Sequence, residues 1–127
     1  MSTDTNDKDK KSNDTKLIEQ KIAKHNIGEY TRHIFLCAGD KCCNEEKGEK
    51  TWEYLKEACE ELRQQGIKVY RTKTTCLRIC AAGPIALVYP EGTWYRDVDK
   101  NNCKRIVEQH LTKGKVVEEL QFAKNPL

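Results

Sequence analysis

The sequence has no long apolar run, no large excess of charge of one sign, and no two cysteines separated by two residues. No stretch approaches the roughly 18 consecutive apolar residues of a membrane-spanning helix, which excludes a transmembrane protein. The first ten residues, MSTDTNDKDK, hold no apolar segment typical of a secretory signal, so we expect no export by that route. A net charge of +3, from 23 basic and 20 acidic residues, is too small to indicate a nucleic-acid-binding protein.

Cysteine is the abundant residue of interest, with seven in 127 residues. In a chain for which we expect no export, this odd number favours reduced thiols or metal ligands over a disulfide framework. The expected location is therefore the cytoplasm. Five of the cysteines fall into two groups along the chain, namely Cys37, Cys42 and Cys43, and then Cys76 and Cys80.

Residues 1–29 are expected to form a polar tail or linker. Within it, residues 1–16 contain four Asp, four Lys and no apolar residue beyond Met1, which predicts disorder. Residues 16–27 carry apolar side chains at a weak helical spacing, so a short helix and further linker are equal alternatives there. Residues 30–127 are expected to form a single domain.

The hydrophobic pattern of this domain predicts an α/β sandwich with a mixed sheet. Strands are predicted where short runs of β-forming residues are bounded by turn residues, over 33–37, 67–72, 84–89 and 93–96. Helices are predicted over 51–62 and 102–111, where apolar residues recur at helical spacing, and Thr51 is the expected N-cap of the first. The predicted order is β-α-β-β-β-α.

The two groups of cysteines follow two of the predicted strands. Because loops that leave neighbouring strands meet at one edge of a sheet, four thiolates can converge there on a metal centre. A structural zinc site is chemically suitable, but such sites more often use cysteines separated by two residues. Buried core thiols explain Cys59 and Cys103, each on the apolar face of its helix, but not adjacent cysteines in a polar loop. An iron–sulfur cluster explains both the loop location and the pairing.

Several motifs occur together in a specific order: HIFLC at 33–37, the Cys42–Cys43 pair, TCLRIC at 75–80, Gly83–Pro84 and VYPEGTWY at 88–95. Together they resemble the thioredoxin-like [2Fe-2S] ferredoxins, which are related to the 24-kDa-type subunit of respiratory complex I. The resemblance implies a thioredoxin-like fold and a [2Fe-2S] cluster on four cysteines, two from each loop. It implies Cys37, Cys76 and Cys80 as ligands and leaves Cys42 and Cys43 as alternatives for the fourth.

The resemblance implies a small one-electron carrier rather than an enzyme, and the sequence holds no dinucleotide-binding Gly motif. Two alternatives stay open: a regulatory or assembly module stabilised by a cluster or zinc, and an electron-delivering subunit of a dehydrogenase complex. We expect a redox partner protein and no nucleic acid or membrane insertion, and the resemblance is compatible with a homodimer. Four basic residues near the cysteines form either a docking surface for an acidic partner or a solvated rim: Lys41, Arg71, Lys73 and Arg78.

Overall fold

The computed structural model describes residues 2–39 and 44–127. Its centre is a five-stranded sheet in the order β2-β1-β3-β4-β5. The strands are β1 (Arg32–Cys37), β2 (Val69–Thr74), β3 (Ile85–Tyr89), β4 (Thr93–Tyr95) and β5 (Gln121–Lys124). β1 pairs parallel with β2, whereas the β1–β3, β3–β4 and β4–β5 pairs are antiparallel. The mixed sheet confirms the predicted α/β class.

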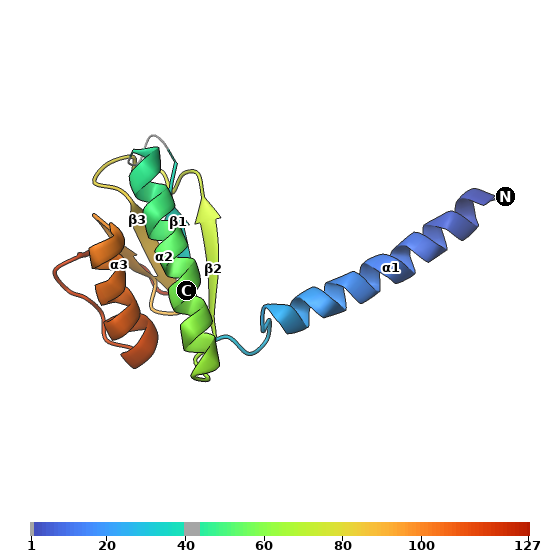
Figure 1. Cartoon of the computed structure of the whole chain (residues 1–127). Coiled ribbons are helices and arrows are strands. Elements are labelled where there is room, and N and C mark those ends of the chain that lie inside the picture. Colours follow the sequence, from blue (N-terminus) through green and yellow to red (C-terminus); the bar gives the residue numbers. More distant parts are fainter. Residues whose placement is uncertain (1, 40–43) are drawn as a thin grey trace.

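Two helical segments lie on the same side of this sheet, as Figure 1 shows. They are α2 (Glu45–Gln64) and α3 (Lys100–Ile106), the latter continuing as the π-helical turn η1 (Val107–Leu111). The chain therefore follows the predicted order β-α-β-β-β-α, with β5 added after the last helix. β5 was not predicted, because its four residues show no apolar alternation, and it forms by pairing with the edge of β4.

The start of α2 differs from the prediction. The helix begins at Glu45 because Asn44 caps it, with the Asn44 side chain accepting a hydrogen bond from the Lys47 amide at 2.7 Å. Thr51, the predicted N-cap, lies inside the helix. Its buried hydroxyl is 3.0 Å from the Lys47 carbonyl oxygen and 3.1 Å from that of Val98, so it ties α2 to the segment before α3.

The hydrophobic core lies between the sheet and the helices. The side chains that α2 buries recur at helical spacing and include Leu55, Ala58, Cys59 and Leu62. They belong to one cluster with alternate residues of the two central strands, namely Ile34, Leu36, Ala86 and Val88. The predicted core positions of Cys59 and Cys103 are confirmed, since their side chains are 4% and 0% exposed.

The opposite face of the sheet carries aromatic side chains. His33 and Phe35 alternate along β1 with the buried core residues, and their rings stack with centroids 4.0 Å apart. Phe35 contacts Tyr89 of β3 edge-on at 6.2 Å, and further along the sheet Trp94 contacts Phe122 at the same distance. Because α2 and α3 both lie on the other side, this aromatic row is the face of the sheet that points away from the core.

A polar network is buried beside the core. His110 is fully buried, its Nδ1 lies 2.7 Å from the Tyr95 hydroxyl, and its Nε2 lies 2.8 Å from a Glu91 carboxylate oxygen. Arg32 in turn pairs with Glu91 at 3.1 Å, and the Val117 amide donates to the Tyr95 hydroxyl at 3.1 Å. The network joins β1, the β3–β4 turn and the C-terminal segment, so His110 has a structural role.

Helix α1 (Ser2–Lys24) precedes the sheet and extends away from it in Figure 1. Its 23 residues differ from the disorder predicted for residues 1–16 and from the short helix considered for 16–27. Its apolar residues Leu17, Ile18 and Ile22 are exposed, so these side chains are not buried against the core, which agrees with the position of the helix apart from the sheet. No helix among residues 2–39 and 44–127 is long and apolar enough to cross a membrane.

Candidate metal centre

The two cysteine loops begin at the same edge of the sheet. β1 and β2 run parallel, and their register places Cys37, the last residue of β1, opposite Thr74, the last residue of β2. The Ala38 amide donates to the Thr74 carbonyl oxygen at 3.0 Å, which extends the pairing by one residue. The segments that follow Cys37 and Thr74 therefore leave the sheet side by side, as the sequence predicts.

A glycine lets these two segments approach closely. A Cβ atom on Gly39 would lie 1.9 Å from the Thr75 carbonyl oxygen, far inside van der Waals contact. Gly48 of α2 packs in a similar way against Ala38, where a Cβ would meet the Ala38 Cβ at 3.1 Å. Gly39 was not among the predicted site residues. Its signal is a glycine two positions after the first cysteine, where a larger side chain would force the loops apart.

The loop after β2 brings two thiols together. The sulfur atoms of Cys76 and Cys80 lie 3.8 Å apart, and both residues are exposed. The Arg78 amide donates to the Cys76 sulfur, with a nitrogen–sulfur distance of 3.2 Å. Amide donors of this kind stabilise the negative charge of a thiolate.

Unusual backbone angles give this loop its curvature. Arg78, Cys80 and Ala82 adopt φ values of 68°, 55° and 54°, in the left-handed region that residues with a Cβ rarely occupy. Each such residue costs about 1 kcal/mol relative to the right-handed conformation. Three of them within five residues indicate a binding loop, because such backbone strain concentrates at binding sites.

Cys37, unlike Cys76 and Cys80, is buried. Its side chain is fully buried with Ile85, against Leu77 and Trp94, and its sulfur lies 3.6 Å from the Thr75 carbonyl oxygen. The third ligand predicted from the resemblance therefore sits at the same edge, on the inner side of the loop that carries Cys76.

The remaining predicted ligands, Cys42 and Cys43, lie outside the described residues, and so does Lys41. Within residues 2–39 and 44–127, no group of three His, Cys, Asp or Glu side chains is placed to hold a metal ion. The structure thus brings Cys76 and Cys80 together and sets Cys37 at their edge of the sheet.

The residues present fit a tetrahedral thiolate site. Ligands at about 2.3 Å from a tetrahedral metal ion are separated by about 3.8 Å, which is the spacing of the Cys76 and Cys80 sulfurs. The amide donor at Cys76 and the buried Cys37 add the hydrogen bond and the partial burial by which proteins tune iron–sulfur clusters.

Two of the four basic residues expected near the site lie elsewhere. Arg71 and Lys73 point toward α2, where the guanidinium carbon and the ammonium nitrogen lie 5.3 and 5.9 Å from the centre of the Trp52 ring. Lys73 also pairs with Glu49 at 3.5 Å. Residues at odd positions of β2 face the core side, so closeness in sequence to the cysteines does not place them at the site. Arg78 is exposed between the two thiols.

The two core cysteines have the opposite electrostatic environment. Burial raises the pKa of Cys59 to about 11, although the positive charge of Arg71 opposes this shift. Burial also raises the pKa of Cys103 to about 12, with smaller contributions from Cys59 and Asp99. These thiols stay protonated at neutral pH, and a protonated thiol is a poor metal ligand.

Comparisons with known proteins give one consistent result, although no family model matches the chain. It is 37% identical over 96 residues to a 2Fe-2S ferredoxin of Clostridium pasteurianum, covering 71% of this chain and 94% of that protein. It is 30% identical over 100 residues to a 2Fe-2S ferredoxin of Aquifex aeolicus, covering 73% and 90%. The solved thioredoxin-like [2Fe-2S] ferredoxin of Aquifex aeolicus superposes with a TM-score of 0.69 at 28% identity, covering 77% of this chain and 96% of that one.

Proposed function

Because this chain belongs to the thioredoxin-like [2Fe-2S] ferredoxins, we propose that it carries single electrons on a cluster bound where β1 and β2 end. Its relatives are electron-transfer proteins, and the chain is an electron carrier rather than an enzyme. The observation that carries the proposal for this edge is the pair of exposed sulfurs of Cys76 and Cys80, 3.8 Å apart beside an amide donor.

Four cysteines would hold the cluster, two from each loop. Cys76 and Cys80 would bind from the loop after β2, and Cys37 from the end of β1. The fourth ligand would be Cys42 or Cys43, from the segment that follows Gly39. The close approach of Gly39 to Thr75 supports this arrangement, because it holds the beginnings of the two loops together.

When bound, the cluster supplies reversible one-electron chemistry. The protein's own residues set the conditions for it. The Arg78 amide donates to the Cys76 sulfur and lowers the cost of negative charge there. Cys37, Ile85 and Leu77 keep water from the inner side, while Cys76 and Cys80 remain exposed and leave a short path to a partner.

Metal and sulfide analysis of the purified full-length protein tests this function. We expect about two iron and two acid-labile sulfide per chain and a red-brown colour. Stoichiometric zinc without sulfide, in protein made under iron-replete conditions, would instead support a zinc-stabilised regulatory or assembly module. Co-purification of a flavin- or NAD-binding protein would point to the third candidate, a subunit that delivers electrons within a dehydrogenase complex.

Ferredoxins donate electrons to partner proteins, and we propose that the partner of this chain is acidic and docks at the cysteine loop. Arg78 offers a positive charge there, and the neighbouring Ile79, 41% exposed, offers apolar contact. A charged rim around an apolar contact is typical of such transient interfaces. Raising the ionic strength should slow electron transfer to the partner, and a rate insensitive to salt would contradict the acidic surface.

We also propose a homodimer that covers the aromatic face of the sheet. Phe122 is 39% exposed beside Trp94, and exposed aromatic groups on a sheet favour contact with a second copy. Light scattering should give twice the chain mass for the wild type and one chain mass for Phe122→Asp. Ile18→Asp, at an exposed apolar residue of α1, should leave the dimer intact. A wild type with the mass of one chain would contradict the dimer.

The division of the chain is likewise a proposal: residues 30–127 form the ferredoxin domain and residues 1–29 an appendage. The cytoplasm is the proposed location, supported by the protonated thiols of Cys59 and Cys103, which a reducing compartment preserves. Removing residues 1–16 should leave cluster content and melting temperature unchanged. A melting temperature lower by several degrees would show that this segment stabilises the domain.

A further inference from the structure

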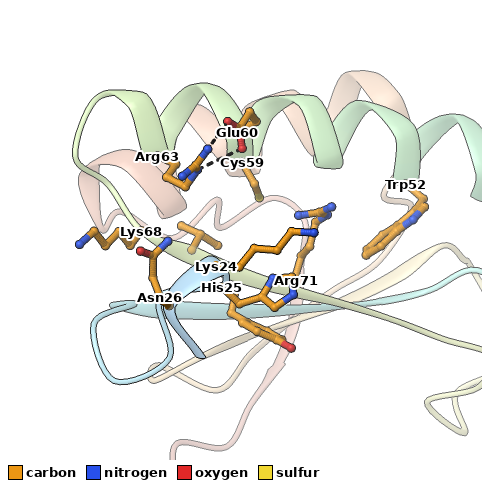
Figure 2. A pocket seen from close by; sticks show the side chains of 12 residues that line it. Lys24, His25, Asn26, Trp52, Cys59, Glu60, Arg63, Lys68 and Arg71 are labelled. Atoms are coloured by element: carbon orange, nitrogen blue, oxygen red, sulfur yellow. Dashed lines mark hydrogen bonds and ion pairs between the residues drawn. The ribbon is translucent and has the colours of Figure 1, made fainter. Parts of the chain in front are cut away.

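A cavity of about 340 Å³ lies between the end of α1, one side of α2 and the first half of β2. Figure 2 shows its lining, with Trp52, Cys59, Glu60 and Arg63 from α2 on one side and Lys24, His25 and Lys68 toward the other. It occupies the opposite end of β2 from the cysteine loop. None of the residues assigned to the cluster lines it.

The lining carries four basic residues and one acidic residue, Glu60. Two of the basic groups are neutralised by the protein, because Arg63 pairs with Glu60 and Lys68 pairs with Glu29 at 2.9 Å. Lys24 and Arg71 have no ion pair with any residue that the structure describes. The cavity therefore has an excess of about two positive charges that the described residues leave unbalanced.

Arg71 lies deepest of these cations in the fold. Its guanidinium carbon lies 5.3 Å from the centre of the Trp52 ring, and its Nε is shielded from solvent without a hydrogen-bond partner among the described residues. In Figure 2 the Lys24 side chain extends across the cavity toward Arg71. Two like charges directed at one space repel each other, and an anion between them would turn that repulsion into attraction.

The thiol in the lining does not oppose an anion. Burial raises the pKa of Cys59 to about 11, so its side chain is neutral at physiological pH. Glu60 is turned toward Arg63, which holds its carboxylate by two hydrogen bonds.

We propose that this cavity binds a phosphate group through Arg71 and Lys24. A phosphate monoester carries a charge of about −1.5 to −2 at pH 7 and offers three acceptor oxygens, which match two unpaired cations better than a single carboxylate does. The planar guanidinium of Arg71, 5.3 Å from the centre of the Trp52 ring, presents its donors in the fixed fork geometry that phosphate oxygens accept. The volume accommodates a small phosphorylated molecule as well as free phosphate.

Calorimetric titration of the cluster-loaded, full-length protein with inorganic phosphate, pyrophosphate and AMP tests this site. Acetate serves as the singly charged control anion. The variants are Arg71→Gln and Lys24→Gln, compared with Lys115→Gln, which removes the same charge from an exposed residue outside the cavity. Lys24 is exposed at the end of α1, so its variant probes the site even where Arg71→Gln lowers the yield of folded protein.

Saturable binding of one phosphate-bearing probe per chain is the expected result. Arg71→Gln should weaken it about tenfold or more and Lys24→Gln severalfold, whereas Lys115→Gln should match the wild type. Tighter binding of AMP than of phosphate would identify a phosphate ester as the ligand, and equal binding would identify free phosphate. No saturable binding, binding of acetate as tight as that of phosphate, or equal weakening by Lys115→Gln would overturn the proposal.

Discussion

The pair Cys76 and Cys80 contrasts with the pair Cys59 and Cys103. The first two are exposed, 3.8 Å apart, in a loop with left-handed residues and an amide donor at one sulfur. The second two are buried in regular helices, and burial raises the pKa of both thiols. The same side chain is therefore a candidate ligand in one place and a small apolar group in the other, and the backbone around it makes the difference.

The two regions also differ in how they are held. The core rests on apolar contacts among α2, α3 and the central strands, which tolerate small changes in shape. The end of the sheet where the two cysteine loops begin depends on a few close approaches, such as that of Gly39 to Thr75. These approaches tolerate almost no change in side-chain size. Substitutions at the edge should therefore affect the cluster, while those in the core should affect stability.

The largest expected effect is the loss of a ligand. Cys76→Ser or Cys80→Ser should abolish or strongly perturb the cluster, because an oxygen replaces a thiolate sulfur at one corner of the site. Iron analysis and visible absorption measure this directly. The single variants Cys42→Ser and Cys43→Ser should differ, with one losing the cluster. A wild-type spectrum in the double variant would show that the first loop supplies only one ligand.

The second prediction concerns the approach of the loops. Gly39→Ala places a Cβ 1.9 Å from the Thr75 carbonyl oxygen, so the loops must separate and cluster content should fall well below that of the wild type. Gly28→Ala is the control, since a Cβ there meets nothing within 4 Å and only the turn's left-handed backbone is strained. Full cluster content in Gly39→Ala would show that the edge is more adaptable than its geometry indicates.

In the core, Cys103→Ser should lower the stability of the fold and leave the cluster unchanged. A hydroxyl buried in place of a thiol without a partner lowers the free energy of unfolding by about 1–3 kcal/mol. Chemical denaturation measures the loss, and the visible spectrum should stay that of the wild type. A changed spectrum would place Cys103 in contact with the cluster and remove the contrast between the two pairs.

The buried network around His110 predicts how stability depends on pH. Burial lowers the pKa of His110, so the unfolded chain binds that proton first and stability falls as the pH drops below about 6.5. Burial alone would raise the pKa of Glu91, but hydrogen bonds from Arg32 and His110 outweigh it and bring the pKa to about 2. The Glu91 contribution is thus complete above its unfolded pKa of 4.5 and lost as the pH falls toward 2.

Urea unfolding of the wild type and Glu91→Gln across this range measures both contributions. The wild type should be the more stable by about 1–3 kcal/mol near neutral pH, and the difference should close below pH 4.5. Glu57→Gln, on the exposed side of α2, should show no such difference. A gap between wild type and Glu91→Gln that is independent of pH would contradict the charged pairing of Glu91.

The smallest expected effect distinguishes the two groups of basic residues. Arg78→Gln should lower the reduction potential slightly, because a positive charge beside the ligands favours the more negative, reduced state. Lys73→Gln should change it less, since Lys73 is paired with Glu49 and lies over Trp52. Redox titration of both variants at low ionic strength measures the two shifts in reduction potential. Equal shifts would mean that Lys73 also acts on the cluster.

The elements of the core could be predicted from local sequence patterns. The helical spacing of Leu55, Cys59 and Leu62 predicted the helix over 51–62, and the short run of β-forming residues predicted the strand over 33–37. Both elements are confirmed. β5 and the Asn44 cap were missed because each depends on a contact. β5 needs the free edge of β4, and the cap needs a helix start that hydrophobic periodicity does not mark.

At the candidate site, the sequence predicted the residue types and the edge where they gather. It did not predict the left-handed backbone of the loop or the Gly39 contact, because both follow from how two distant segments pack. Arg71 shows that closeness in sequence to the cysteines does not place a residue at the candidate site. Five residues before Cys76, it nevertheless points toward α2 and lines a separate cavity.

Electron paramagnetic resonance of the reduced protein tests the central claim most directly. A [2Fe-2S] cluster is silent when oxidised and gains one unpaired electron on reduction, so the wild type should give a signal of about one spin per chain only after reduction. Cys59→Ser should give the same signal, whereas in Cys76→Ser the signal should be lost or strongly altered. A protein that shows no signal after reduction, or a signal that survives in Cys76→Ser and disappears in Cys59→Ser, would contradict this account.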